Sequence, residues 1–186
     1  MLYYAVAAGI AIVAAASGYF ISRFTTEAPA PVADTPASPA QGVDLANMTP
    51  REAADRLFNR IVRASEQGDM EEARRFAPMA LQAYALVDGL DADAHYHLGL
   101  IHLIAGDVEN ARKEADTLKQ STPDHLLAYM LEHSIAEQSG DRAAAAAAFT
   151  AFTAAYDAEI KTQRPEYEAH RAAIERFRST GAGSQN

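Results

Sequence analysis

The chain of 186 residues has no cysteine and no tryptophan, and its 25 acidic residues outnumber its 16 basic ones, which gives a net charge of −9. The lack of cysteine excludes disulfides, thiolate metal sites and a cysteine nucleophile. A nucleic-acid surface needs clustered lysine and arginine, because these side chains displace counterions from phosphate groups. The sequence contains no basic run, so we expect no nucleic-acid partner.

The sequence also lacks the motifs of catalysis and nucleotide binding. It contains no glycine-rich phosphate loop, no nucleophile elbow and no paired-cysteine motif. We therefore predict that the protein is not an enzyme, carries no cofactor and binds no small-molecule substrate.

The N-terminal segment is a long stretch without charge. Residues 2–22 contain no charged side chain and have aromatic residues at both ends. About 20 apolar residues in a helix span a bilayer, and aromatic side chains favour its two interfaces. We therefore predict a single-pass transmembrane helix over residues 1–24, in contact with the lipid bilayer through residues 2–22. Small residues at four-residue spacing would let this helix pack closely against another: Ala5, Gly9, Ala14 and Gly18.

A cleaved signal peptide is the alternative interpretation of this segment. The alanines at positions 14–16 offer a small-residue cleavage site, but the first four residues lack the basic charge that starts a signal peptide. We favour a retained anchor and leave cleavage open. Arg23 follows the span, and the excess of basic residues on cytoplasmic sides of membranes points the rest of the chain toward the cytoplasm.

Three further segments follow the anchor. Residues 25–48 are rich in proline and alanine and have almost no large apolar residue, so they cannot bury enough surface to offset the entropy of ordering. We interpret them as a semi-extended linker. A helical domain over residues 49–180 and a disordered tail over residues 181–186 complete the predicted organisation.

The helical domain begins with a strong start signal. Thr49 can cap a helix, Pro50 suits the first helical position and Glu52 completes a capping box. Pro78 lies within the second helical run and should kink or break it. A final amphipathic helix should start near Pro165 and cap the open end of the domain.

Three Gly-Asp dipeptides divide the domain into similar units, at residues 68–69, 106–107 and 140–141. The glycine can adopt the left-handed conformation that ends a helix, and the aspartate can cap the next helix. Each dipeptide is followed by a similar helical run with an alanine at a matching place, namely Ala73, Ala111 and Ala145. Repeats of this length indicate a stack of helix pairs.

The middle unit, residues 92–125, resembles the tetratricopeptide repeat family. Leu98-Gly99 stand at the Leu-Gly pair of that family, Ala111 stands where the paired helices meet, and Pro123 closes the unit. The flanking units match the pattern in part. The resemblance implies an all-α fold, a short solenoid of about three helix pairs with a C-terminal capping helix, which would follow the transmembrane helix.

Three histidines cluster in the middle unit: His95, His97 and His102. His95 and His102 are two helical turns apart, about 10 Å along the axis, which is too far to share one ion. The i, i+4 histidine pair of a His-Glu-x-x-His site is absent. We therefore interpret these histidines as structural, the nearby aspartates as helix caps, and predict no metal site.

In tetratricopeptide proteins the first helix of each pair builds an inner face that binds partner segments. Aligning the three units by their glycines assigns a mostly apolar set of side chains to this face: Phe58, Val62, Tyr96, Leu100, Leu103, Met130, Ser134, Glu137 and Gln138. For Leu100 and Leu103, burial in the core is an equal alternative. We expect an apolar or amphipathic segment of a protein partner there. The resulting hypothesis is a membrane-anchored adaptor or scaffold. The alternative is a fixed accessory subunit of a membrane protein complex.

Overall fold

The computed structural model describes residues 48–183, which are all α-helical with one short 3₁₀ helix and contain no strand. The predicted transmembrane helix, its packing residues and nearly all of the linker lie outside this range. None of the helices inside it has the length and apolarity needed to cross a bilayer. The elements are α1 Pro50–Glu66, α2 Met70–Tyr84, α3 Ala92–Ala105, α4 Val108–Ser121, α5 Leu126–Ser139, α6 Arg142–Glu159, the 3₁₀ helix Ile160–Thr162, α7 Pro165–Ala169 and α8 Arg171–Gly183.

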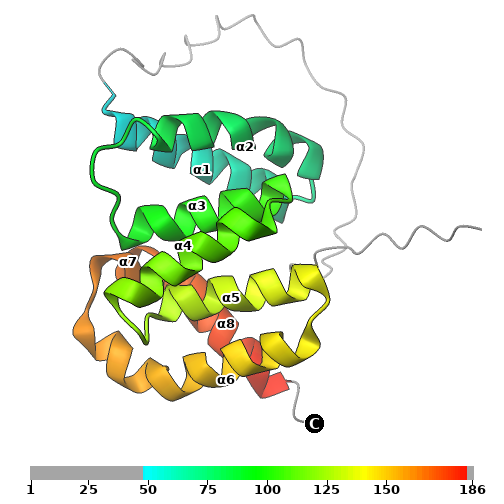
Figure 1. Cartoon of the computed structure of the whole chain (residues 1–186), viewed down its shortest axis with the longest axis vertical. Helices are drawn as coiled ribbons and strands as arrows, with labels where there is room; N and C mark the ends of the chain where they lie inside the picture. The colour runs from blue at the N-terminus through cyan, green and yellow to red at the C-terminus, as the bar shows by residue number, and fades with distance from the viewer. Residues whose placement is uncertain (1–47, 184–186) are drawn as a thin grey trace, which may run out of the picture.

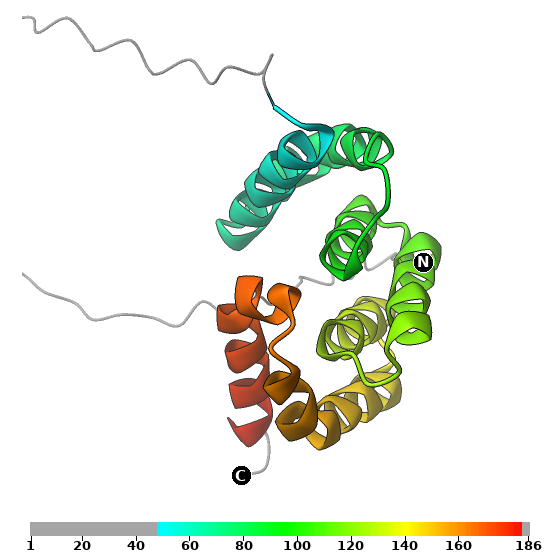
Figure 2. The same ribbon diagram turned by 90° about the vertical axis from the view of Figure 1, so that its left-hand side faces the viewer.

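The first six helices form three consecutive hairpins, α1–α2, α3–α4 and α5–α6, which stack one upon the next (Figure 1). The first helix of each hairpin faces the inner side of the stack. Figure 2 shows α7 and α8 lying across this inner side, opposite α3 and α5. The all-α class and the solenoid-like arrangement of three helix pairs are therefore confirmed.

The turns between paired helices form as the Gly-Asp dipeptides predicted. The three glycines adopt left-handed backbone angles, with φ of +79°, +84° and +73° in chain order. Each following aspartate caps the next helix by accepting a hydrogen bond from a backbone N–H three residues on, at 2.9, 3.1 and 2.9 Å. The capping box at Thr49 and Glu52 is also present. These local signals explain where the hairpins turn.

Pro78 does not break α2, so that part of the expectation is wrong. The helix runs without a break from Met70 to Tyr84. Proline cannot donate to the carbonyl of Arg74, four residues earlier. Both residues are exposed, so water can bond this carbonyl and the helix tolerates the missing hydrogen bond.

Close packing between neighbouring hairpins depends on Gly99. A Cβ atom built at this position would lie 2.2 Å from Cδ2 of Leu131 on α5, far inside van der Waals contact. A glycine here therefore lets α3 approach α5. The alanines that follow the three Gly-Asp turns are buried within their helices, with Ala73 and Ala111 at 0% exposure and Ala145 at 3%.

The C-terminal segment is two helices, not the single helix that the sequence predicted. Pro165 begins α7 as expected, and the chain bends at His170 before α8 begins. Ile174 is fully buried, and the Phe177 ring packs edge-on against Phe152 of α6 at 4.8 Å and against His133 of α5 at 5.0 Å. We name α7, His170 and α8 together the C-terminal hairpin. It covers the third helix pair and also reaches the inner surface of α3.

Candidate functional site

A cleft of about 370 Å³ opens on the inner side of the stack, between α1, α3 and the C-terminal hairpin. We name it the inner cleft. Its apolar walls come from α1 and α3, and small side chains of the C-terminal hairpin face them. The residues that line it are Asp55, Phe58, Asn59, Val62, Asp93, Tyr96, His97, Leu100, Ala169, His170 and Ala173.

Four of the side chains predicted for a partner-binding face line the inner cleft: Phe58, Val62, Tyr96 and Leu100. The five others do not. The C-terminal hairpin packs against α5 beside the positions predicted there, and Leu103 is buried in the core at 6% exposure. The predicted set is therefore split: its α1 residues and two of its three α3 residues line an open cleft, whereas Leu103 and the α5 residues do not. The set outside the cleft is Leu103, Met130, Ser134, Glu137 and Gln138.

The two aromatic residues of the cleft form its floor. Phe58 and Tyr96 are each 5% exposed. Phe58 stacks on the His97 ring with centroids 3.6 Å apart, and Tyr96 meets the His170 ring edge-on at 4.9 Å. Val62 and Leu100 are half-buried and Asn59 is exposed. A ligand would therefore touch Val62, Leu100 and Asn59 most directly.

One wall of the cleft carries a polar cluster that sequence reasoning missed. Nε2 of His97 lies 3.1 Å from Nε2 of His170, which lies 2.8 Å from Oδ1 of Asp93. The third side of this triangle, from Oδ1 of Asp93 to Nε2 of His97, is 3.6 Å. We name these three residues the Asp-His-His cluster. It is the group of histidine and acidic side chains in the described residues whose ligand atoms converge closely enough to hold a metal ion.

Part of this cluster could have been found from the sequence. Asp93 and His97 are four residues apart, so both project from one face of α3. A search for two histidines at this spacing does not detect an aspartate and a histidine, although both can bind a metal ion. His170 gives no such signal, because it is 73 residues beyond His97 and reaches the cluster only through tertiary folding.

A relay of hydrogen bonds behind His97 fixes the orientation of its ring. The Tyr84 hydroxyl donates to Oδ1 of Asp55 at 2.7 Å and lies 2.6 Å from Nδ1 of His97. Arg51 in turn binds Asp55 at 2.8 Å and Asp93 at 2.6 Å. The relay ties α1, α2 and α3 together, and its buried end faces the cluster.

The charge states within the cluster follow from burial and from neighbouring charges. Burial lowers the pKa of His97 to about 4, against the opposing effect of the Asp93 carboxylate. Burial acts to raise the pKa of Asp93, but the hydrogen bond from His170 and the positive charge of Arg51 act against it, and that pKa is lowered. At neutral pH the cluster therefore contains a neutral His97 and an ionised Asp93.

The two other histidines of α3 do not belong to the cluster. Nδ1 of His95 lies 2.7 Å from Glu114 of α4, and Nδ1 of His102 lies 3.4 Å from the Asp107 carboxylate. His125, at the start of α5, lies 3.0 Å from Glu166 of α7 and so links the C-terminal hairpin to the stack.

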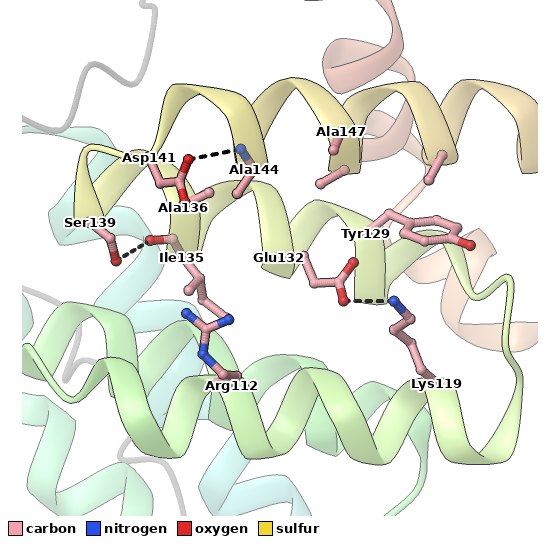
Figure 3. A pocket seen from close by; sticks show the side chains of 12 residues that line it. Arg112, Lys119, Tyr129, Glu132, Ile135, Ala136, Ser139, Asp141, Ala144 and Ala147 are labelled. Carbon is pink, nitrogen blue, oxygen red and sulfur yellow. Dashed lines mark hydrogen bonds and ion pairs between the residues drawn. The ribbon is translucent and has the colours of Figure 1, made fainter.

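A second depression lies on the opposite side of the stack, between α4, α5 and α6. We name it the outer groove; its volume is about 410 Å³. Figure 3 shows Arg112 and Lys119 extending from α4 toward α5, with alanines of α6 on the far side. Lys119 pairs with Glu132 at 2.7 Å. Small and charged side chains make up most of the groove lining, together with Tyr129 and Ile135, and none of the lining residues is a histidine.

Comparison of the chain with protein-family models, with curated proteins and with solved structures found no match. Membership of the tetratricopeptide repeat family therefore stays a prediction from the residues of the middle unit.

Proposed function

We propose that this protein is a membrane-anchored adaptor with a tetratricopeptide-like solenoid, and that it binds an apolar or amphipathic segment of another protein in the inner cleft. The observation that carries the proposal is the cleft itself. Four side chains that the repeat pattern assigns to a partner-binding face line it together.

The packing of the C-terminal hairpin supports an amphipathic helix as the occupant. Helix α8 lies against α5 with Ile174 buried and Phe177 against the core. The inner surface thus already accepts one helix of this kind. The cleft continues that surface over α1 and α3, and Ala169 and Ala173 on its other wall are small enough to leave space for large apolar side chains.

A weak ion pair joins α1 to α8 one helical turn beyond Val62 and Ala173, which line the cleft. Glu66 of α1 and Arg176 of α8 face each other at 4.0 Å, and both side chains are more than half exposed. Exposed ion pairs contribute about 0–1 kcal/mol. A partner segment can therefore displace this contact easily.

The predicted transmembrane helix over residues 1–24 gives the adaptor its location. Tethering raises the local concentration of a bound partner without adding contacts. Residues 2–22 should keep the protein in the membrane fraction against high salt and alkaline carbonate, and deletion of residues 1–24 should release it with unchanged helicity. Recovery of a mature N-terminus near Ser17 would instead support a cleaved signal peptide.

Site-specific crosslinking tests the cleft. A photoreactive residue at Asn59, which is exposed and lines the inner cleft, should capture a discrete partner in cells, whereas the same residue at Ala147 in the outer groove should not. Val62→Asp places a charge in the cleft and should abolish the Asn59 crosslink, and Ala147→Asp should leave it unchanged. Equal crosslinking from both positions, or a crosslink that survives Val62→Asp, would contradict the proposal.

Purification in a mild detergent separates the adaptor from the alternative. A fixed accessory subunit should co-purify with its complex at constant stoichiometry. An adaptor should be recovered largely alone and regain its partner on mixing, because its contact is limited to one cleft.

A further inference from the structure

We propose that Asp93, His97 and His170 bind a divalent first-row transition-metal ion, with Zn²⁺ as the test ion, and that this ion fastens the C-terminal hairpin to α3. The inference does not depend on the adaptor function. The three ligand atoms come from two parts of the chain, with two on α3 and one at the bend between α7 and α8.

The spacing of the ligand atoms suits such an ion. Zinc binds histidine nitrogen and carboxylate oxygen at about 2.0–2.2 Å, so two ligands of one ion lie about 2.9–3.5 Å apart for angles between 90° and tetrahedral. The three atoms of the cluster are separated by 2.8, 3.1 and 3.6 Å. A small displacement of each side chain would place them around one ion.

The hydrogen bonds behind His97 prepare its Nε2 atom for coordination. The single proton of the Tyr84 hydroxyl goes to Asp55, so the contact at 2.6 Å between this hydroxyl and Nδ1 of His97 requires Nδ1 to carry a proton. In the neutral ring, Nε2 then has a free lone pair that points to His170 and Asp93. Ligands of metal ions are commonly oriented in this way by a partner on the second ring nitrogen.

The chemistry of the donors indicates the class of ion. Two imidazole nitrogens and one carboxylate suit zinc, iron, cobalt or nickel, whereas magnesium and calcium prefer oxygen ligands alone. All three residues also line the inner cleft. The remaining coordination position of the ion would therefore face the cleft, where water or a ligand can reach it.

A hydrogen-bonded cluster without metal is the competing explanation. In that case Nε2–H of His170 would be shared between Asp93 and His97, and no ion would be needed. The two explanations differ in what they predict for zinc affinity, since a closed hydrogen-bond network gains nothing from the ion.

The experiment uses the untagged full chain in mild detergent, stripped with a chelator and then titrated with Zn²⁺ by calorimetry. We expect binding of one ion per chain, and a thermal unfolding midpoint that rises by roughly 5 °C or more at saturating zinc. The same concentration of Mg²⁺ should have no effect. His170→Gln and Asp93→Asn should each lose at least tenfold in zinc affinity and most of the thermal shift.

His95→Gln is the matched control, because His95 is also half-buried on α3 and bonded to one carboxylate, at 2.7 Å from Glu114. It should bind zinc like the unmodified chain. X-ray absorption of the zinc-loaded unmodified protein keeps the test valid if a variant fails to fold, and it should show two imidazoles and a carboxylate oxygen around the ion.

Absence of saturable zinc binding, retained affinity in both His170→Gln and Asp93→Asn, or an absorption spectrum without imidazole ligands would overturn the proposal. Val62→Asp changes the cleft but none of the three ligands, so it should abolish the Asn59 crosslink and still bind zinc, and the two proposals can fail separately.

Discussion

The inner cleft and the outer groove are similar in size but are built in opposite ways. The outer groove lies between three consecutive helices, α4, α5 and α6, so its walls are close in sequence. The inner cleft joins α1 and α3 to the C-terminal hairpin, and contacts such as His170 to Asp93 connect residues 77 positions apart. The outer groove therefore follows from the hairpin stack itself, whereas the inner cleft exists only while the C-terminal hairpin is docked.

The polar groups of the two sites also differ, both in how deeply they are buried and in how many partners hold them. Lys119 and Glu132 of the outer groove are about one-third exposed and pair with each other. The Asp-His-His cluster is more deeply buried, with side chains 20% exposed or less, and rests on the relay through Tyr84 and Asp55. Buried networks of this kind are stabilising only when each member keeps its partner. Variants of the inner cleft should therefore have larger effects than variants of the outer groove.

The largest effect should come from detaching the C-terminal hairpin. Ile174 is fully buried on α8, and truncation of a buried isoleucine to alanine destabilises by about 2–5 kcal/mol. We expect Ile174→Ala to lower the free energy of unfolding in urea by this amount and to weaken the protection of His170 from solvent. Leu86→Ala, at a side chain that is 72% exposed, is the control and should change stability by less than about 0.5 kcal/mol.

The next largest effect should come from separating α3 from α5. Gly99→Ala introduces a Cβ 2.2 Å from Leu131, and overpacking of this kind lowers stability by about 1–3 kcal/mol. Because α3 carries two members of the Asp-His-His cluster, the same variant should reduce zinc affinity without altering any ligand. Ala146→Leu, at an exposed position of α6, should change neither quantity. A neutral Gly99→Ala would show that the hairpins are packed more loosely than the structure indicates.

A smaller change in the free energy of unfolding should come from lowering the pH, and a residue of the inner cleft, His97, should be one of its causes. Burial lowers the pKa of His97 from its ordinary value of 6.5 to about 4, so between these two pH values the unfolded chain binds more protons than the folded chain. Stability is therefore complete above pH 6.5 and falls as the pH decreases toward 4. In chelator, the free energy of unfolding should drop by about 1–2 kcal/mol from pH 7.5 to pH 5.

Burial also lowers the pKa values of His125 and His133, so these residues add to the decrease in the same direction. His97→Gln should make the pH dependence shallower. A stability that stays constant from pH 7.5 to pH 5 would contradict the assignment of buried neutral histidines.

The smallest effect should come from the outer groove. Lys119→Ala removes the pair with Glu132, and a partly exposed pair contributes about 0–1 kcal/mol. We expect a change within this range in urea unfolding, and no change in zinc affinity or in crosslinking from Asn59. A larger loss would mean that the outer groove is structurally coupled to the cleft.

The sequence was informative where structure depends on near neighbours. The Gly-Asp turns, the capping box at Thr49 and the start of α7 at Pro165 each follow from a few adjacent residues, and each was predicted correctly. A kink or break was predicted at Pro78, and the break does not occur. The carbonyl that loses its hydrogen bond is exposed to water, and this exposure depends on the tertiary structure. The position of His170 against α3 could not be predicted at all. The residue pattern of a final helix shows which of its faces is apolar, but not against which helices that face packs.

The distance in sequence between the walls of the inner cleft also sets an order of events during synthesis. The chain leaves the ribosome from its N-terminus, so α1 to α6 emerge and can stack through local contacts before residue 170 has emerged. During that interval Phe58, Tyr96 and His97, which the C-terminal hairpin later helps to enclose, face solvent. A ligand for the inner side of the stack thus meets a more open surface on the nascent chain before α7 and α8 emerge, and docking of the C-terminal hairpin completes the site.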